Sequence, residues 1–302
     1  MEKFKDLRIV DNFYQTSAFF PMPTTLISTV NAEGKTNIGA YSLCFPYYIA
    51  GKDYYAMILE ARNSSNTAQN ILLNKKATLN FITDERKYFK EAVRLGFPGD
   101  TTDEKMKNCI FTLTDSTLGA DRPKIIEESY QVFECTWDDS LEEAFNDKPG
   151  CLEGYQPPYR NFNGITSKFG AHFILKIDKI WMKEKQYNAI VNGVKASAFP
   201  NVPVDYGYRD STNFWYTKFK RPIAEKIQAK EGDVTSVIYA AERIDPDVKF
   251  TKEACAKLTK IPRIFLKAAL TQMVNIAKEE GISLIDEQAL TVINDKRRKE
   301  KK

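Results

Sequence analysis

The first half of the chain alternates short apolar runs with turn-forming residues, a pattern typical of β-strands joined by tight turns. Thr24–Val30 (TTLISTV) is rich in β-branched residues, and Asn31–Gly34 supplies turn chemistry before a second extended segment begins at Thr36. The segments predicted as strands are Thr24–Val30, Thr36–Leu43, Tyr54–Leu59, Ala77–Ile82, Tyr130–Trp137 and His172–Trp181. The pattern therefore predicts a sheet of many short strands.

One segment among these strands has helical spacing instead. Ser64–Asn74 (SSNTAQNILLN) begins with residue types that cap free backbone amides, and Ala68, Ile71 and Leu72 recur at helical intervals. A single helix among short strands predicts an α+β fold, mainly β, in which a β-barrel carries an inserted helix, rather than a doubly wound sheet.

The pattern becomes helical near the end of the chain. Apolar positions recur at three- and four-residue steps in residues 251–280 and 286–295. Pro262 is suited to a helix start, Gly281 to a helix stop and Asp286 to capping the last helix.

This change predicts two domains, residues 1–244 and residues 245–302, the second being small and helical with a basic tail. A segment as short as the second is small for an independent hydrophobic core. We therefore expect it to dock on the barrel or on a partner.

The net charge of +4 is concentrated at the C-terminus. Residues 296–302 hold six basic residues and one acidic residue, so the rest of the chain sums to −1. A solvated, frayed end explains such a tail, and contact with nucleic acid or an anionic surface is the alternative. The body of the chain shows no nucleic-acid footprint, so we expect no nucleic-acid partner.

Composition excludes several classes of protein. The 43% of hydrophobic residues and 28% of charged residues are ordinary for a globular protein. One histidine, His172, and five cysteines without a C-x-x-C pair argue against zinc, two-His iron and iron–sulfur sites, so we expect no metal. A Ser-His-Asp hydrolase would need His172 as its base. Scattered thiols fit a reducing compartment, and no apolar run has the length of a membrane helix or a signal peptide, so we expect a cytoplasmic protein without a membrane span.

Three stretches in the first third carry a recognisable order, although neither G-x-G-x-x-G nor G-x-x-x-x-G-K-[ST] is present. They are Pro21–Thr25 (PMPTT), Asn37–Pro46 (NIGAYSLCFP) and Arg62–Ile71 (RNSSNTAQNI). In their order and spacing they resemble the flavin reductase-like family, and the resemblance continues through Ser129–Trp137 and Gly170–Trp181. It implies an FMN-binding split β-barrel over about residues 1–240, followed by the small helical domain.

The resemblance also implies where FMN would bind. A phosphate favours free amides at a helix N-terminus, hydroxyl groups and a fixed positive charge. The phosphate would be held by Arg62, Ser64, Ser65, Asn66 and Thr67, the ring by Tyr41, Ser42, Leu43 and Cys44, and the ring or ribityl edge by Thr24 and Thr25. In the structural alternative, Ser64–Thr67 only cap a helix and Thr24–Thr25 are ordinary strand residues.

Two positions depart from the family pattern. Ser65 stands where many members have a lysine, so phosphate affinity depends more on Arg62 or on a partner subunit. Ala171 replaces an acidic or glycine residue before His172. We therefore interpret His172 as a structural histidine, with contact to a nicotinamide as the alternative.

The implied activity is that of an FMN-dependent oxidoreductase, with FAD as the alternative cofactor. Hydride would pass from NADH or NADPH to the flavin, and electrons would then pass to free flavin, oxygen or a partner redox protein. This step needs no protein acid or base, so no catalytic residue is predicted. Family members generally form homodimers, and we expect the same here. A non-enzymatic electron relay and an interaction module without cofactor remain the alternatives.

The C-terminal segment resembles the small helical domain of a light-independent protochlorophyllide reductase subunit. The resemblance rests on the segments Phe250–Ala254, Leu258–Ile264 and Ala277–Ile285. It implies docking to another protein, such as a redox partner, or to a neighbouring domain. An ordinary helical extension that completes a dimer is the alternative.

Overall fold

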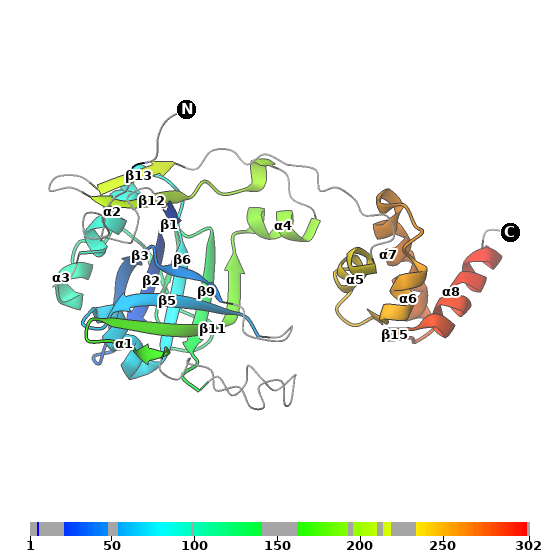
Figure 1. Cartoon of the computed structure of the whole chain (residues 1–302), viewed down its shortest axis with the longest axis horizontal. Helices are drawn as coiled ribbons and strands as arrows, with labels where there is room; N and C mark the ends of the chain where they lie inside the picture. The colour runs from blue at the N-terminus through cyan, green and yellow to red at the C-terminus, as the bar shows by residue number, and fades with distance from the viewer. Residues whose placement is uncertain are drawn as a thin grey trace. The chain divides into compact units, whose positions relative to one another are not determined.

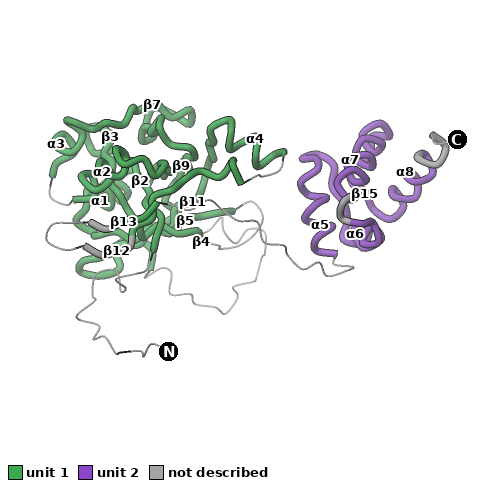
Figure 2. The backbone as a smooth tube through the Cα atoms, turned by 90° about the horizontal axis from the view of Figure 1, so that it is seen from above, with its two compact units in different colours: residues 1–224 green, residues 225–302 purple. Residues whose placement is uncertain are grey.

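The computed structural model describes residues 5, 21–47, 54–97, 100–140, 162–192, 196–209, 214–218 and 234–300. It divides the chain into two compact units, residues 1–224 (unit 1) and residues 225–302 (unit 2) (Figure 2). Each unit has a hydrophobic core of its own.

Antiparallel strands of unit 1 form one long, curved sheet (Figure 1). Their order is β3-β2-β6-β9-β11-β5-β4, and β10 pairs with β11. The strands are β2 (Thr25–Val30), β3 (Thr36–Tyr41), β4 (Cys44–Tyr47), β5 (Ala56–Arg62), β6 (Lys76–Phe81), β9 (Gln131–Trp137), β10 (Gly164–Ile165) and β11 (Gly170–Met182). Every strand predicted from the sequence is confirmed, with slightly shifted ends.

Shorter strands and helices surround this sheet. β1 (Met22–Pro23), β12 (Pro203–Arg209) and β13 (Phe214–Lys218) form a small second sheet, and β7 (Leu113–Thr114) pairs with β8 (Ile125–Ile126). The helices of unit 1 are α1 (Asn66–Asn74), α2 (Arg86–Leu95), α3 (Thr102–Met106), α4 (Glu184–Asn192) and the 3₁₀ turn η5 (Ala196–Ala198).

Alternate side chains of β2 and β3 are buried on opposite faces of the sheet, as the period of two requires. Ile27 belongs to the barrel core, which also contains Ile71 of α1. Leu26 and Ile38 belong to a second core, which contains Leu95 of α2. Helix α1 therefore covers the inner face of the sheet and α2 the outer face.

Helix α1 is attached to β2 by asparagines as well as by its apolar side. Asn66, Asn70 and Asn74 are four residues apart and so lie on one side of the helix. Asn70 Nδ2 donates a hydrogen bond to Thr29 Oγ1 (3.0 Å), and Asn74 Nδ2 donates one to the Val30 carbonyl (2.6 Å). Breaking a buried bond of this kind costs about 1–3 kcal/mol, so the helix has one preferred position on the sheet.

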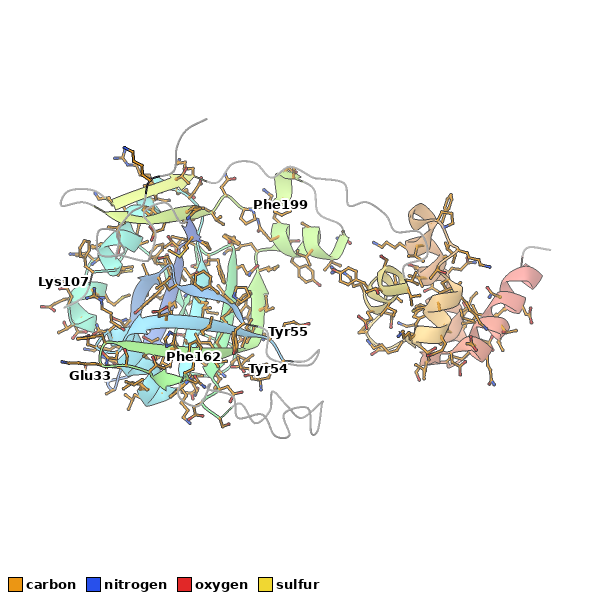
Figure 3. The ribbon with its side chains drawn as sticks, in the orientation of Figure 1. Glu33, Tyr54, Tyr55, Lys107, Phe162 and Phe199 are labelled. Atoms are coloured by element: carbon orange, nitrogen blue, oxygen red, sulfur yellow. The ribbon has the colours of Figure 1, made fainter. Side chains whose placement is uncertain are left out.

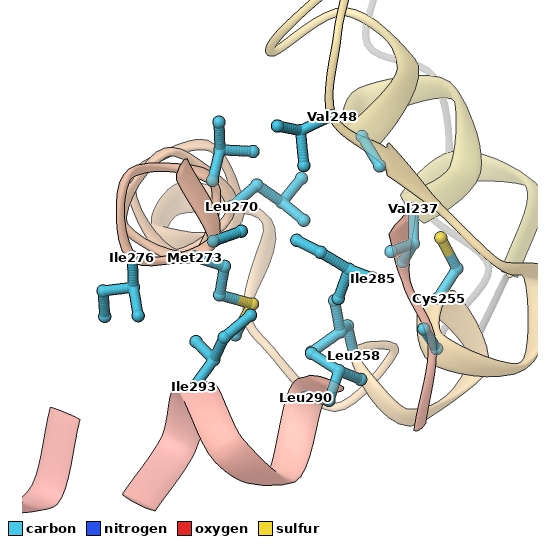
Figure 4. Close-up of a cluster of buried hydrophobic side chains, with 14 of the residues drawn as sticks. Val237, Val248, Cys255, Leu258, Leu270, Met273, Ile276, Ile285, Leu290 and Ile293 are labelled. Atoms are coloured by element: carbon cyan, nitrogen blue, oxygen red, sulfur yellow. The ribbon is translucent and has the colours of Figure 1, made fainter. Parts of the chain in front are cut away.

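Unit 2 is helical, with one short pair of parallel strands. Its elements are α5 (Val234–Glu242), β14 (Lys249–Phe250), α6 (Lys252–Lys257), α7 (Arg263–Glu279), β15 (Leu284–Ile285) and α8 (Glu287–Glu300). Leu270 and Met273 of α7 meet Ile285 and Ile293 in its core (Figure 4). The apolar face of α7 thus finds partners within the unit itself, contrary to the expectation that so short a segment lacks an independent core.

The helix signals predicted for this region are confirmed. Pro262 is the N-cap of α7, and Asp286 Oδ1 accepts a hydrogen bond from the Ala289 amide (2.8 Å) at the start of α8. Gly281 follows α7 with φ +69°, a conformation that favours glycine. In the described part of the chain, no helix combines the length and apolar character that crossing a bilayer needs.

The boundary between the units lies earlier than the predicted one at residues 244 and 245. Val237 and Ala241 of α5 are buried in the core of unit 2. The predicted boundary would have separated α5 from these partners. The apolar periodicity of so short a helix is too weak to reveal, from sequence alone, which core it joins.

We predict that a chain ending at residue 224 stays soluble, whereas a chain ending at residue 245 aggregates, because the second keeps α5 without the residues that bury it. All three tryptophans, Trp137, Trp181 and Trp215, lie in unit 1. Their fluorescence therefore reports on the folding of unit 1 in both truncated chains. The soluble yield of each chain is measured in the same experiment. Equal solubility of the two chains would contradict the observed boundary.

Candidate functional site

The end of β3 meets the beginning of α1, and most of the predicted site residues lie on or next to these two elements. Thr25 of β2 is the cross-strand partner of Tyr41 at the end of β3. The Tyr41 hydroxyl donates a hydrogen bond to Ser65 Oγ (3.3 Å). Burial raises the pKa of Tyr41 above its ordinary value, so the phenol keeps its proton at neutral pH.

Gly39 allows α1 to approach β3 this closely. A Cβ on Gly39 would lie 2.7 Å from Thr67 Oγ1 and 2.8 Å from Tyr41 Cε2, both shorter than real contacts of a Cβ atom. Thr67 is itself buried. The glycine therefore determines how near the first turn of α1 stands to the sheet.

Asn37 lies fully buried on the same face of β3. Its Oδ1 accepts hydrogen bonds from Asn66 Nδ2 (3.2 Å) and from Thr102 Oγ1 (3.5 Å), and Asn66 Nδ2 also donates to the Asp100 carbonyl (2.9 Å). Among the described residues, the Nδ2 group of Asn37 has no acceptor. A buried donor of this kind is costly when it is unsatisfied.

The turn between β5 and α1 is held from both sides. The Ser65 amide donates to the Arg62 carbonyl (3.0 Å) across the turn. Asn63 connects the turn to the loop before β11: its Nδ2 donates to the Lys168 carbonyl (2.8 Å), and its amide donates to the Phe169 carbonyl (3.1 Å). The backbone from residue 62 to residue 65 is therefore fixed by local and distant bonds.

This arrangement uses some of the predicted phosphate-binding side chains for structure and leaves others free. Ser65 Oγ caps α1 by accepting from the Ala68 amide (3.1 Å), while Asn66 and Thr67 hold the helix on β3. Arg62 and Ser64 are exposed, and no described residue pairs with either side chain.

The first-turn amides complete the positive end of α1. The Ala68 amide is capped by Ser65 and the Gln69 amide donates to the Ser65 carbonyl (3.0 Å), whereas no described group accepts from the amides of Asn66 and Thr67. Free amides and the helix dipole both favour an anion at this end. With Arg62 and Ser64 close by in the chain, the helix start offers the charge, hydroxyl and amides that a phosphate favours.

The residues predicted to contact the ring lie on the β3–β4 connection. Ser42 is buried, Leu43 is half-buried, and the Leu43 carbonyl accepts from the Glu60 amide (2.9 Å). The Cys44 side chain lies in the barrel core, and burial raises its pKa to about 12. Its thiol is therefore a small apolar core group, as expected for most cysteines here.

Thr24 precedes β2 and lies beside the small second sheet. Its amide donates to the Pro203 carbonyl (3.3 Å), and in the described structure its buried Oγ1 has no hydrogen-bond partner. Thr25, by contrast, faces Tyr41 across the strands. Thr24 Oγ1 is thus a second buried polar atom without a hydrogen-bond partner among the described residues.

His172 on β11 has partners that account for its position. Its Nδ1 lies 2.8 Å from Thr166 Oγ1, and its Nε2 lies 3.9 Å from Glu60 Oε2. Its ring stacks on that of Phe162, which Figure 3 labels, with centroids 4.5 Å apart. These contacts favour the structural interpretation of His172. Over the described ranges, no cluster of three or more His, Cys, Asp or Glu residues could hold a metal ion.

Sequence reasoning missed Asn37, Gly39 and Asn63 as individual contributors to this site. Asn37 and Gly39 stand in the quoted NIGAYS segment, but their roles depend on Asn66 and Thr67, which are distant in the chain. The role of Asn63 depends on its hydrogen bonds to the carbonyls of Ser167 and Lys168, which lie 104 and 105 residues further along the chain. No local pattern signals such contacts.

No protein-family model matches this sequence, and no curated protein matches it. Solved structures do resemble it. The 2-nitrobenzoate 2-nitroreductase NbaA of Pseudomonas fluorescens is 16% identical with a TM-score of 0.52, and the match covers 74% of this chain and 93% of that chain. Nitrilotriacetate monooxygenase component B from Bacillus cereus is 12% identical with a TM-score of 0.51, covering 76% and 98%. A putative flavin reductase with a split barrel domain from Shewanella frigidimarina is 14% identical with a TM-score of 0.47, covering 69% and 87%.

These similarities concern the fold. The chain shares its fold with NbaA and with component B, and the predicted α+β fold, in which strands form a curled antiparallel barrel sheet with an inserted helix, is confirmed. The likeness of the C-terminal segment to a protochlorophyllide reductase subunit stays a prediction.

We predict that Gly39→Ala lowers the stability of unit 1 by about 1–3 kcal/mol, the usual cost of overpacking, because the new methyl group displaces Thr67 or Tyr41. Urea unfolding followed by tryptophan fluorescence measures the change. Leu73→Ala, which truncates a side chain exposed on α1, is the control and should change stability by less than about 0.5 kcal/mol. Wild-type stability of Gly39→Ala would show that α1 does not depend on this close approach.

Proposed function

We propose that unit 1 is an FMN-binding oxidoreductase that takes hydride from NADH or NADPH. One observation carries the proposal. Among the described residues, two amides at the beginning of α1 have no acceptor and the neighbouring side chains of Arg62 and Ser64 have no partner, and the buried Nδ2 group of Asn37 lies at the same helix start. These groups match the donors that a phosphate monoester needs.

Different residues of the chain would hold different parts of the cofactor. Arg62, Ser64 and the amides of Asn66 and Thr67 would hold the phosphate, while Ser65 fixes the turn that presents them. Thr25, Tyr41, Ser42 and Leu43 would lie along the ring, and Cys44 would contribute through its backbone because its thiol lies in the core. The buried Oγ1 of Thr24 would bond a polar edge of the ring or ribityl chain.

Bound FMN would supply the capacity to accept a hydride from a reduced nicotinamide. The protein's part is to orient the two rings and exclude water, and it needs no acid or base for the transfer. Tyr41 would not serve as a base, since burial raises the pKa of its phenol and its proton is donated to Ser65 Oγ. This division of roles between cofactor and protein agrees with the contacts of His172, the single histidine of the chain. Its Nδ1 lies beside Thr166 Oγ1, and its ring stacks on Phe162.

The fold supports a redox function. Two of the similar structures, with TM-scores of 0.52 and 0.51, bear the names of a nitroreductase and a monooxygenase component. The proposal includes a homodimer. Many members of the family that the sequence resembles have a lysine at the position of Ser65, so Arg62 is the one fixed positive charge among the residues assigned to the phosphate. A partner subunit would supply a second charge.

We predict that Arg62→Ala combined with Ser64→Ala weakens FMN binding at least about tenfold, because a charge-assisted hydrogen bond contributes about 1.5–3 kcal/mol. Quenching of FMN fluorescence measures the affinity. Riboflavin, which lacks the phosphate, should bind both proteins equally. Arg86→Ala removes an exposed arginine of α2 that has no partner among the described residues, and it is the matched control. An unchanged FMN affinity would refute this placement of the phosphate.

We also predict that purified protein loaded with FMN oxidises NADH or NADPH with no other protein added, as followed by absorbance at the reduced-nicotinamide band. FMN retained without oxidation would favour the electron relay. A colourless protein that takes up no added FMN would favour the interaction module and overturn the proposal.

A further inference from the structure

The turn that joins β10 to β11, residues 166–170, lies against the turn that precedes α1. Asn63 Nδ2 donates a hydrogen bond to the Lys168 carbonyl (2.8 Å), and the Asn63 amide donates to the carbonyl of the next residue (3.1 Å). In the sequence Asn63 stands between Arg62 and Ser64, the two residues whose side chains were assigned to the phosphate. The β10–β11 turn is therefore a neighbour of the proposed phosphate site, although it is distant from that site in the sequence.

The backbone of the β10–β11 turn is fixed by its own hydrogen bonds. Ser167 Oγ accepts from the amides of Phe169 (3.2 Å) and Gly170 (2.9 Å), and the Ser167 amide donates to the Gly170 carbonyl (3.2 Å). A serine that bonds its own following amides is a common way to stabilise a tight turn. The backbone that carries Lys168 thus has a defined position, while its four-carbon side chain stays flexible.

The positive charge of Lys168 is not neutralised by the described residues around it. The side chain is exposed, has no acidic partner in the described structure, and holds its Nζ 5.4 Å from the centroid of the Phe169 ring. Strand β5 and the β10–β11 turn together contain one acidic residue, Glu60. The Glu60 carboxylate lies beside His172 Nε2 (3.9 Å).

Other segments also bond to the beginning of α1, but they bring no positive charge. Asn66 Nδ2 donates to Asn37 Oδ1 (3.2 Å) and to the Asp100 carbonyl (2.9 Å). Neither residues 37–41 (NIGAY) nor residues 100–102 (DTT) include a lysine or an arginine. Among the described segments bonded to residues 62–67, the β10–β11 turn is therefore the one that contributes a cation.

We infer that Lys168 is a phosphate-binding residue of the flavin site, an inference that rests on the proposed function. A phosphate monoester carries a charge of about −1.5 to −2 at pH 7, which is more than Arg62 neutralises alone. Lys168 adds a positive charge from the same chain, in addition to any charge that a partner subunit brings. The lysine acts as a mobile point charge, while the amides of Asn66 and Thr67 and the buried Nδ2 group of Asn37 supply directional bonds.

The test compares the affinities of full-chain variants for FMN and for riboflavin, measured by quenching of flavin fluorescence. Lys168→Ala should weaken FMN binding at least about threefold, and Lys168→Glu at least about tenfold, because attraction is first removed and then replaced by repulsion. Lys168→Arg keeps the charge and should stay within about twofold of the wild type. Riboflavin, which lacks the phosphate, should bind all of these proteins equally.

The matched control is Lys90→Ala, which removes an exposed lysine of α2 that has no partner among the described residues. It should leave the affinities for both flavins unchanged. An effect on FMN as large as that of Lys168→Ala would indicate a general attraction between the protein and an anion, and would overturn the inference.

Two further measurements separate an effect of charge from damage to the turn. Raising the salt concentration from about 50 to about 300 mM should weaken FMN binding more in the wild type than in Lys168→Ala, because the variant has one fewer attraction to screen. Asn63→Ala detaches the β10–β11 turn from the beginning of α1, so adding Lys168→Ala to it should weaken FMN binding by less than about twofold. Tryptophan fluorescence checks that unit 1 is folded in each variant.

The outcomes distinguish this inference from the proposed function. If the wild type binds FMN and Lys168→Ala binds it equally well, or loses riboflavin affinity to the same extent, the inference is overturned and the flavin site is retained. A wild-type protein that binds neither flavin would overturn the proposed function and this inference with it.

Discussion

The contact between the first turn of α1 and strand β3 is the constraint on which the candidate site depends. Gly39 permits the close approach, Asn37 and Asn66 bond across it, and Tyr41 reaches Ser65 from the end of the strand. Because these bonds are directional, they determine the orientation of the helix as well as its distance from the sheet. The amides of Asn66 and Thr67, which have no acceptor among the described residues, therefore have a fixed position and direction.

This contact also separates the polar residues of the helix start into two groups. Ser65, Asn66 and Thr67 hold the backbone, whereas the side chains of Arg62 and Ser64 have no partner in the part of the chain that the structure describes. A site built in this way is preorganised, because the groups that would hold an anion need not rearrange first. The same reasoning assigns Cys44 to the core, where its thiol has no access to a ligand.

The sequence revealed the elements better than their contacts. Alternation in TTLISTV and the Ser-Ser-Asn-Thr start of α1 are local signals, and β2 and α1 appear where those signals predict them. The division of labour between Ser64 and Ser65 could not be predicted, because it depends on Tyr41 and on the turn geometry. The unit boundary was misplaced for the same reason, since burial of Val237 and Ala241 depends on helices that follow much later.

The central claim is that the beginning of α1 holds the phosphate of FMN. Amide-detected NMR of ¹⁵N-labelled protein during addition of FMN tests it most directly. The account predicts that the backbone amide signals of Asn66 and Thr67 and the side-chain amide signal of Asn37 shift with FMN, and that riboflavin leaves the two backbone signals in place. FMN binding that leaves these three signals unmoved, or that shifts signals of unit 2 instead, would contradict it.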